Sequence, residues 1–195
     1  MIAAVFACAG CGGSPIEGVT IAEVSDRAPV DTRRLLFAPA EMAVLRADDS
    51  PAPASLVLGG APQSDSVLLL RFVSSLPDDA EVTGAFVLLS RSEDARPPKS
   101  ALAIEVSRIL DPWTDRSVSW GRQPRTSLPE GSMTLTPRLA DVLRVDVTSI
   151  VRAWPKRRPD DHGIALRASG DDPSGWSYAL GTTQGRGPVL EVYVR

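Results

Sequence analysis

Cysteine and histidine are nearly absent from this chain, which has two cysteines and one histidine in 195 residues. Both cysteines, Cys8 and Cys11, stand within the first eleven residues, so the remainder can form neither a disulfide nor a cysteine-based metal site. The single His162 excludes metal sites built from paired histidines and leaves one candidate base for a histidine-dependent triad. The folded part must therefore be held together by packing.

A strong charge of either sign is also missing. The chain has 21 Lys and Arg against 24 Asp and Glu, a formal net charge of −3 at pH 7, which argues against nucleic acid as a partner. Aromatic residues make up 5%, but hydrophobic residues reach 43%, which is typical of a globular domain. A nucleophile elbow, a Walker loop and a Rossmann fingerprint are all absent, so no enzymatic activity is expected.

The first eleven residues are uncharged, apolar and end in small residues, which is typical of the hydrophobic part of a secretory signal. They are too few to span a bilayer as a helix. Ala9-Gly-Cys11 followed by Gly-Gly-Ser resembles a bacterial lipoprotein box, which implies that Cys11 is acylated and becomes the N-terminus. The alternative is an ordinary buried or frayed N-terminus. No Lys or Arg precedes the apolar run, and a start codon upstream of Met1 would account for this.

Residues 12–34 are rich in Gly, Pro, Ser and Asp, and this composition predicts a flexible tether. Its mean reach would be roughly 25–30 Å, enough to hold a domain clear of lipid head groups. A short strand over 19–24 is the competing interpretation. The folded domain is expected to cover 35–195.

Hydrophobic and polar residues alternate in many short segments after residue 35. In 102–107, 143–148 and 190–195 this alternation predicts strands with one face in the core and one in water. The run 66–73 is apolar on both faces apart from Arg71, which is typical of a central strand covered on both sides. Further strands are expected at 41–46, 55–59, 81–90, 117–120, 132–136, 163–168 and 176–181.

One short helix is expected over 149–154. Thr148 is predicted to cap its first N–H groups, and Pro155 is predicted to end it. Many short strands with almost no helix predict an all-β fold, an antiparallel two-sheet β-sandwich of the jelly-roll kind.

Several motifs follow one another in a fixed order: strands at 68–72 and 82–89, W-T-x-x-x-V-x-W at 113–120, V-D-V-T-x-x-V-x-x-W at 145–154, G-I-A-L at 163–166, and a closing strand at 188–193. This order resembles the DNRLRE domain. The resemblance covers about 35–195 and implies a non-catalytic jelly-roll module of secreted and surface proteins, related to carbohydrate-binding modules.

Four aromatic side chains are expected in the core. Trp113 and Trp120 stand seven residues apart and are predicted to cover one end of the sandwich, and Trp154 is predicted to close the core under the short helix. Phe72 belongs to the strand run described above.

The remaining candidates for stacking on a sugar ring are Trp176, Tyr178 and Tyr193. Trp176 and Tyr178 share a strand face, so both are buried or both are displayed, and Leu180 on the same face favours burial. Tyr193 is expected on the polar face of the last strand.

Acidic pairs in two turns could supply oxygen ligands to a structural Ca²⁺, although solvated turns are the favoured interpretation. The carboxylates concerned are Asp160, Asp161, Asp171 and Asp172. No other cofactor is expected.

The sequence therefore predicts a non-catalytic lipoprotein, exported across the cytoplasmic membrane and anchored by lipid, with the outer membrane as the expected site. Its sandwich domain is expected to bind or organise polysaccharide. One alternative is a structural or assembly subunit that contacts another envelope protein. A polysaccharide-cleaving enzyme is the weakest hypothesis.

Overall fold

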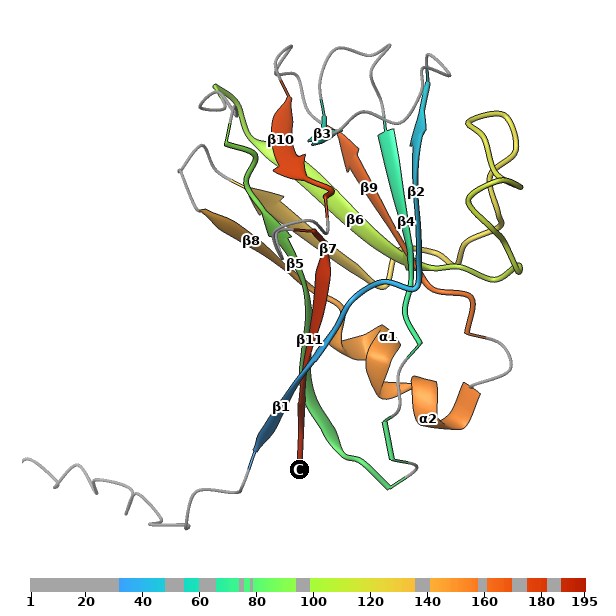
Figure 1. Cartoon of the computed structure of the whole chain (residues 1–195), viewed down its shortest axis with the longest axis vertical. Coiled ribbons are helices and arrows are strands. Elements are labelled where there is room, and N and C mark those ends of the chain that lie inside the picture. The colour runs from blue at the N-terminus through green and yellow to red at the C-terminus, as the bar shows by residue number, and fades with distance from the viewer. Residues whose placement is uncertain are drawn as a thin grey trace, which may run out of the picture. The chain divides into compact units, whose positions relative to one another are not determined.

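The computed structural model describes residues 32–47, 55–59, 66–73, 76–77, 79–93, 99–135, 141–157, 161–169, 175–181 and 187–195. These residues form eleven strands and two short helices (Figure 1). The elements are β1 (Arg33–Phe37), β2 (Glu41–Arg46), β3 (Ser55–Leu58), β4 (Ser66–Arg71), β5 (Val82–Ser90), β6 (Leu102–Arg108), β7 (Gly131–Leu135), β8 (Val142–Asp146), α1 (Thr148–Arg152), α2 (Trp154–Arg157), β9 (Ile164–Ser169), β10 (Trp176–Ala179) and β11 (Val189–Val194).

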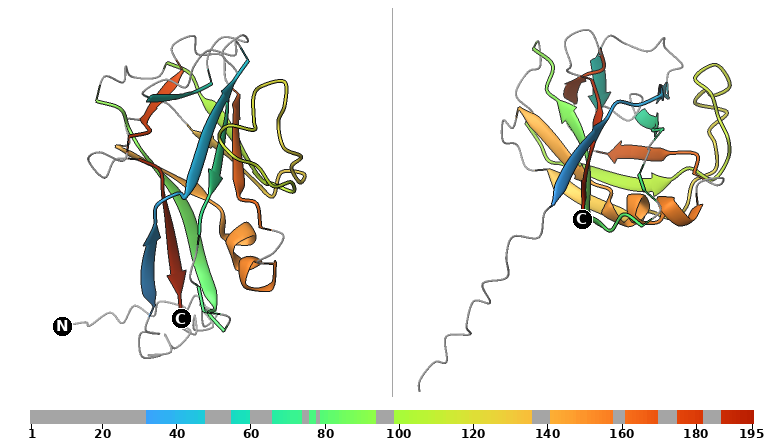
Figure 2. Two further views of the ribbon diagram at one scale, coloured as in Figure 1. Left: turned by 45° about the vertical axis from the view of Figure 1, so that its right-hand side comes forward. Right: turned by 60° about the horizontal axis from the view of Figure 1, so that its bottom comes forward.

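The strands form two main antiparallel sheets. One sheet has the order β1-β11-β5-β8, and the other has the order β2-β4-β9-β6-β7. A third, two-stranded sheet pairs β10 with β3. The two helices lie together beside the lower part of β5 (Figure 2). The predicted all-β antiparallel sandwich with one short helical segment is confirmed.

The strand pairs are nested in sequence. The innermost pair is the β6–β7 hairpin, and outside it follow β5 with β8, β4 with β9, β3 with β10, and β1 with β11. Together these nested pairs form one long hairpin. Its innermost pair, β6 with β7, lies in the five-stranded sheet and the next pair, β5 with β8, lies in the four-stranded sheet, so the hairpin crosses from one layer to the other. Such nesting is typical of a jelly roll.

The main core lies between the sheets. On β6, Leu102, Ile104 and Val106 point inward, while the residues between them are exposed. β8 repeats the pattern with Leu143 and Val145. The predicted wet face of these two strands is confirmed, because an antiparallel sheet with one covered face alternates in this way.

β4 is buried on both faces, as its sequence predicts. Leu68 and Leu70 belong to the main core, whereas Val67 and Leu69 belong to a second, smaller cluster on the outer face of the five-stranded sheet. The chain between β6 and β7 supplies the cover for this second cluster, with Trp113 at its centre (yellow-green in Figure 1).

Two strand assignments differ from the sequence prediction. β1 was assigned in part to the tether, but it pairs with β11 along its whole length, so the predicted boundary at residue 35 falls inside a strand. Segment 117–120 is not a strand; it holds a single bridge between Ser119 and Arg122. Its apolar residues alternate because Val118 and Trp120 pack on the second cluster. Cys11 and residues 12–31 lie outside the described residues.

The helix begins differently from the prediction. Thr148 is its first residue, and its hydroxyl bonds the backbone N–H and C=O of Ala85 on β5 instead of capping the helix. The carboxylate of Asp146 accepts the Thr148 N–H at 2.8 Å. Pro155 does not end the helical segment but lies in the first turn of α2, where a missing N–H costs nothing.

Replacing Gly163 should destabilise the fold. Gly163 has φ +108°, and a Cβ there would lie 2.2 Å from the carbonyl oxygen of Leu70. We expect Gly163→Ala to lower the free energy of unfolding by at least about 2 kcal/mol in urea titrations. Gly121→Ala is the control, because nothing lies within 4 Å of its Cβ position; it should change the free energy by less than about 0.5 kcal/mol. Equal effects of the two substitutions would contradict the strain argument.

Candidate functional site

Two of the three predicted sugar-stacking residues are buried. Trp176 is 9% exposed and Tyr178 is 3% exposed, and both belong to the main core. The Trp176 indole donates to the backbone carbonyl of Ser100 at 3.3 Å, and burial raises the pKa of the Tyr178 hydroxyl. Both residues are therefore buried, which is the alternative that the sequence favoured, and their rings are not displayed for stacking on a sugar. β10 turns this face inward, as the apolar Leu180 on the same face had favoured.

The predicted core aromatics are mostly where the sequence placed them. Phe72 and Trp154 are buried in the main core, with ring centroids 6.4 Å apart. Trp113 is buried and Trp120 is partly buried, but they pack on the outer face of the five-stranded sheet. The prediction that they cover one end of the sandwich is wrong, because the long β6–β7 connection folds sideways over the sheet.

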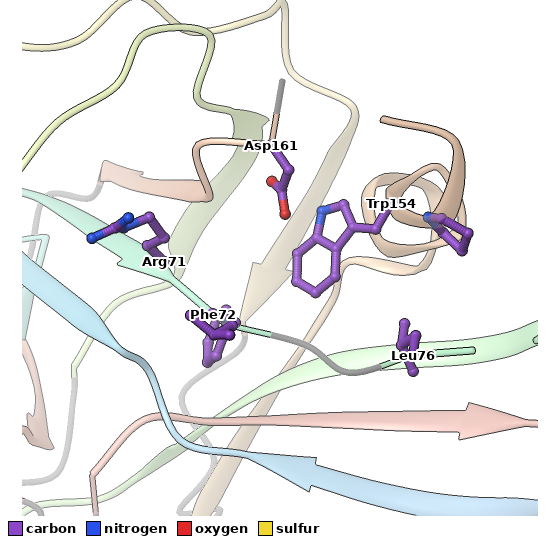
Figure 3. A pocket seen from close by; sticks show the side chains of 7 residues that line it. Arg71, Phe72, Leu76, Trp154 and Asp161 are labelled. Atoms are coloured by element: carbon purple, nitrogen blue, oxygen red, sulfur yellow. The ribbon is translucent and has the colours of Figure 1, made fainter. Parts of the chain in front are cut away.

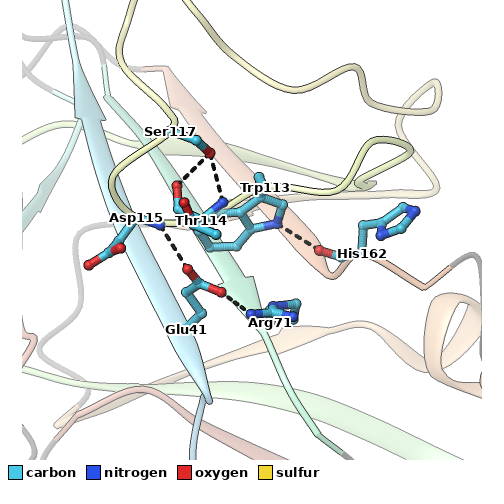
Figure 4. Close-up of polar contacts among 7 residues, drawn as sticks. All are labelled: Glu41, Arg71, Trp113, Thr114, Asp115, Ser117 and His162. Atoms are coloured by element: carbon cyan, nitrogen blue, oxygen red, sulfur yellow. Dashed lines mark hydrogen bonds and ion pairs between the residues drawn. The ribbon is translucent and has the colours of Figure 1, made fainter.

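Polar contacts hold this connection on the sheet (Figure 4). The Trp113 indole donates to the backbone carbonyl of His162 at 2.7 Å. Glu41 accepts the Asp115 N–H at 2.8 Å and also pairs with Arg71. These side chains are thus engaged in fixing the loop. His162 contributes its backbone carbonyl to this network, and no hydrogen bond of its imidazole is seen within the described residues.

The four-stranded sheet presents an outer face that differs in character. Its strands place Leu36, Glu191, Phe86 and Asp146 in one row across β1, β11, β5 and β8. Leu36 is 55% exposed in this row, whereas Glu191 is only 2% exposed. The sequence prediction of a wet face for the last strand is therefore wrong at Glu191.

Glu191 is buried because two arginines close over it. The Arg34 Nε donates to its carboxylate at 2.5 Å, and the Arg144 guanidinium lies 2.8 Å from its other oxygen. The same Arg144 guanidinium stacks 4.2 Å from the centroid of the Phe86 ring. Both arginine side chains remain about half exposed. The buried carboxylate thus fixes two guanidinium groups that still offer donors to solvent.

Tyr193 completes the outer face, as the sequence predicted for the last strand. Its ring meets Phe86 edge-on, with centroids 6.4 Å apart at 80°. Gly84, directly opposite on β5, leaves room beside both rings. The Tyr193 hydroxyl has no hydrogen-bond partner among the described residues, and the side chain is only partly buried. We call the group Arg34, Leu36, Phe86, Arg144, Glu191 and Tyr193 the aromatic face.

A pocket of about 240 Å³ lies where β4 ends beside α2 (Figure 3). Its walls include Phe72, Leu76 and Pro155, and the indole of Trp154 and the carboxylate of Asp161 also line it. The indole nitrogen of Trp154 is buried and has no hydrogen-bond partner. Burial raises the pKa of Asp161, although its bond from the Gly163 N–H opposes this shift.

Of the four candidate Ca²⁺ ligands, the structure describes only Asp161. No group of three or more His, Cys, Asp or Glu side chains that could hold a metal occurs among the described residues. Asp161 accepts the Gly163 N–H at 3.1 Å, and Asp160, Asp171 and Asp172 lie outside the described residues. A helix long and apolar enough to cross a bilayer is likewise absent from the part of the chain that the structure describes.

Comparison with known proteins adds no further constraint. A scan against protein-family models found no match, and a search of curated proteins found none either.

The sequence pointed to Tyr193 but not to the other members of the aromatic face. Arg34 belonged to the predicted tether, and Glu191 and Arg144 were ordinary polar positions in alternating strands. Arg34, Arg144 and Glu191 come together only because β1, β11, β5 and β8, which are far apart in the chain, are neighbours in one sheet. No local signal could have revealed it.

Proposed function

We propose that this chain is a non-catalytic glycan-binding module and that the aromatic face is its binding surface. One observation carries the proposal: the outer face of the four-stranded sheet is partly exposed and combines a Tyr193–Phe86 ring pair with two guanidinium groups paired with a buried carboxylate. Sugar recognition needs apolar or aromatic surface for ring faces together with fixed donors for hydroxyl groups.

The geometry of the aromatic face supports this ligand class. Tyr193 offers a partly exposed ring with a free hydroxyl, and the neighbouring Leu36 extends the apolar surface across β1. Arg34 and Arg144 keep their orientation because Glu191 and Phe86 hold them. Donors that are fixed before the ligand arrives lose less conformational entropy on binding. The resemblance to the DNRLRE domain, a relative of carbohydrate-binding modules, leads to the same proposal.

The opposite sheet is less suited to the same task. Its outer face is partly covered by the β6–β7 connection, which packs Trp113 and Trp120 against the sheet. Exposed side chains there, such as Thr134 on β7 and Glu105 on β6, are small or polar. The proposal therefore assigns the glycan to one face of the sandwich only.

We also propose that the module is held at the cell envelope by lipid on Cys11, in keeping with the resemblance of residues 9–14 to a lipoprotein box. Two acyl chains supply the stable anchoring that one chain does not give.

A second candidate function is assembly with another envelope protein. β7 and β8 are the end strands of their sheets, and a groove of about 350 Å³ lies between them. Val106, Met133 and Val145 contribute apolar surface to this groove. An extended partner segment could add to either strand through backbone hydrogen bonds.

Removing the ring of Tyr193 should weaken glycan binding. We expect Tyr193→Ala in the full chain to lower the affinity for a retained polysaccharide at least about tenfold, because the stacking surface is lost. The measurement is retention on a glycan array followed by calorimetry of the glycan that binds.

Thr134→Ala, on the exposed outer face of the other sheet, is the matched control and should bind as the unchanged chain does. Unchanged binding by Tyr193→Ala would contradict the assigned surface. An empty array together with co-purification of one stoichiometric protein would favour the assembly function.

Replacing Cys11 should release the protein from the membrane. We expect Cys11→Ser to abolish labelling by a radioactive or clickable fatty acid and to move the chain into the soluble fraction, because the acyl acceptor is gone. Cys8→Ser is the control and should remain labelled and membrane-bound. Equal labelling of both variants would contradict the lipoprotein assignment.

A further inference from the structure

The pocket beside α2 has more room than ordered water requires. Its volume is about 240 Å³, whereas a water molecule takes about 30 Å³ of liquid volume. Phe72, Leu76 and Pro155 form the apolar part of its wall, while Arg71 and Asp161 form the polar part. The neighbouring Val73 is 75% exposed, which places the pocket at the surface. The pocket can therefore hold an organic group.

Two buried donors of pocket-lining residues, the indole nitrogen of Trp154 and Nε of Arg71, have no hydrogen-bond partner among the described residues. Trp154 is 3% exposed, and its indole nitrogen has no hydrogen-bond partner within the part of the chain that the structure describes. A buried N–H donor without an acceptor destabilises a native structure, so nearly all such groups are paired. The ring itself is fixed by Phe72 and by its place in the main core. The indole thus presents a fixed, unused donor.

Asp161 supplies an acceptor next to this donor. Figure 3 shows its carboxylate and the indole nitrogen of Trp154 facing the same space. One carboxylate oxygen accepts the Gly163 N–H at 3.1 Å, and the other has no partner among the described residues. Arg71 also lines the pocket, but its guanidinium points away from Asp161 and pairs with Glu41. The pocket therefore places the indole donor of Trp154 and the carboxylate of Asp161 beside the apolar side chains of Phe72, Leu76 and Pro155.

A secondary amide that carries a methyl group matches this combination. Its carbonyl would accept the Trp154 N–H, its N–H would donate to the second oxygen of Asp161, and its methyl would contact Phe72 and Leu76, which all line the pocket. A hydroxyl can also donate and accept, but it leaves the apolar wall uncovered. An anionic group would face the Asp161 carboxylate.

We propose that this pocket binds the acetamido group of an N-acetylated amino sugar. The inference rests on the proposed function for the ligand class, a glycan, but it concerns a different site from the aromatic face. Each site can therefore be tested without the other.

The indole N–H of Trp154 gives a direct readout. In ¹H–¹⁵N spectra of the full chain, Trp154→Phe identifies this resonance among the signals of the four tryptophans. N-acetylglucosamine at millimolar concentration should move the Trp154 resonance in the direction of stronger hydrogen bonding. Glucose, which carries a hydroxyl in place of the acetamido group, should leave it unchanged.

Asp161→Asn tests the acceptor without removing volume. The substitution replaces the free oxygen by an NH₂ group that faces the ligand N–H, so affinity for N-acetylglucosamine should fall about tenfold. Asp115→Asn is the control, because Asp115 is exposed and uses only its backbone N–H in the structure. Urea unfolding of both variants separates loss of binding from loss of fold.

An unmoved Trp154 resonance, an equal response to glucose, or full affinity in a folded Asp161→Asn variant would each overturn this inference. The proposed function fails separately, if Tyr193→Ala leaves polysaccharide binding intact while the Trp154 resonance responds. Conversely, Tyr193→Ala could lose polysaccharide binding while N-acetylglucosamine leaves the Trp154 resonance unmoved. That result would support the aromatic face as the glycan site and contradict the acetamido site.

Discussion

The two-sided burial of β4 is the constraint on which the rest of the structure depends. With no cysteine after Cys11, the sheets have no covalent link, and packing must fix their positions. Leu68 and Leu70 pack between the sheets, while Val67 and Leu69 pack under the β6–β7 connection. The five-stranded sheet therefore lies between two apolar layers. Among the described residues, the four-stranded sheet has an apolar layer on one face, and on its other face Leu36, Arg34 and Arg144 are about half exposed.

The open face is built around a buried charge. A carboxylate that loses water on folding destabilises a protein unless it is paired and hydrogen-bonded. Glu191 is hydrogen-bonded by Arg34 through one oxygen and forms an ion pair with Arg144 through the other, which has no hydrogen-bond partner among the described residues. The two arginines come from β1 and β8 at the two sides of the sheet. The ion pairs thus tie together strands that are far apart in the chain. Their side chains cover the carboxylate, and Phe86 holds one of the two guanidinium groups.

The sequence predicted most strands because their signal is local. The alternation over 102–107 and the apolar run over 66–73 both gave the right strand and the right kind of burial. β1 was missed because Arg33 and Arg34 resemble the polar tether before them. The pairing of β1 with β11 is what gives these arginines a place in a sheet. Local patterns do not contain such long-range pairing.

The candidate sites were predicted less well than the fold, for the same reason. Tyr193 was correctly placed outside the main core, but Trp176 and Tyr178 were not available for stacking once β10 turned them inward. Trp154 was expected in the core, and it is there. That its indole nitrogen lacks a hydrogen-bond partner among the described residues, and that Asp161 lines the same pocket, are features that residue spacing alone does not give.

The most direct test of the account is to map a bound oligosaccharide on the ¹⁵N-labelled full chain by backbone amide shifts. We expect the largest changes on β1, β5, β8 and β11 around Tyr193 and Glu191, with α2 as a second, smaller region. Changes centred on the β6–β7 connection around Trp113, with the four-stranded sheet unmoved, would contradict the account.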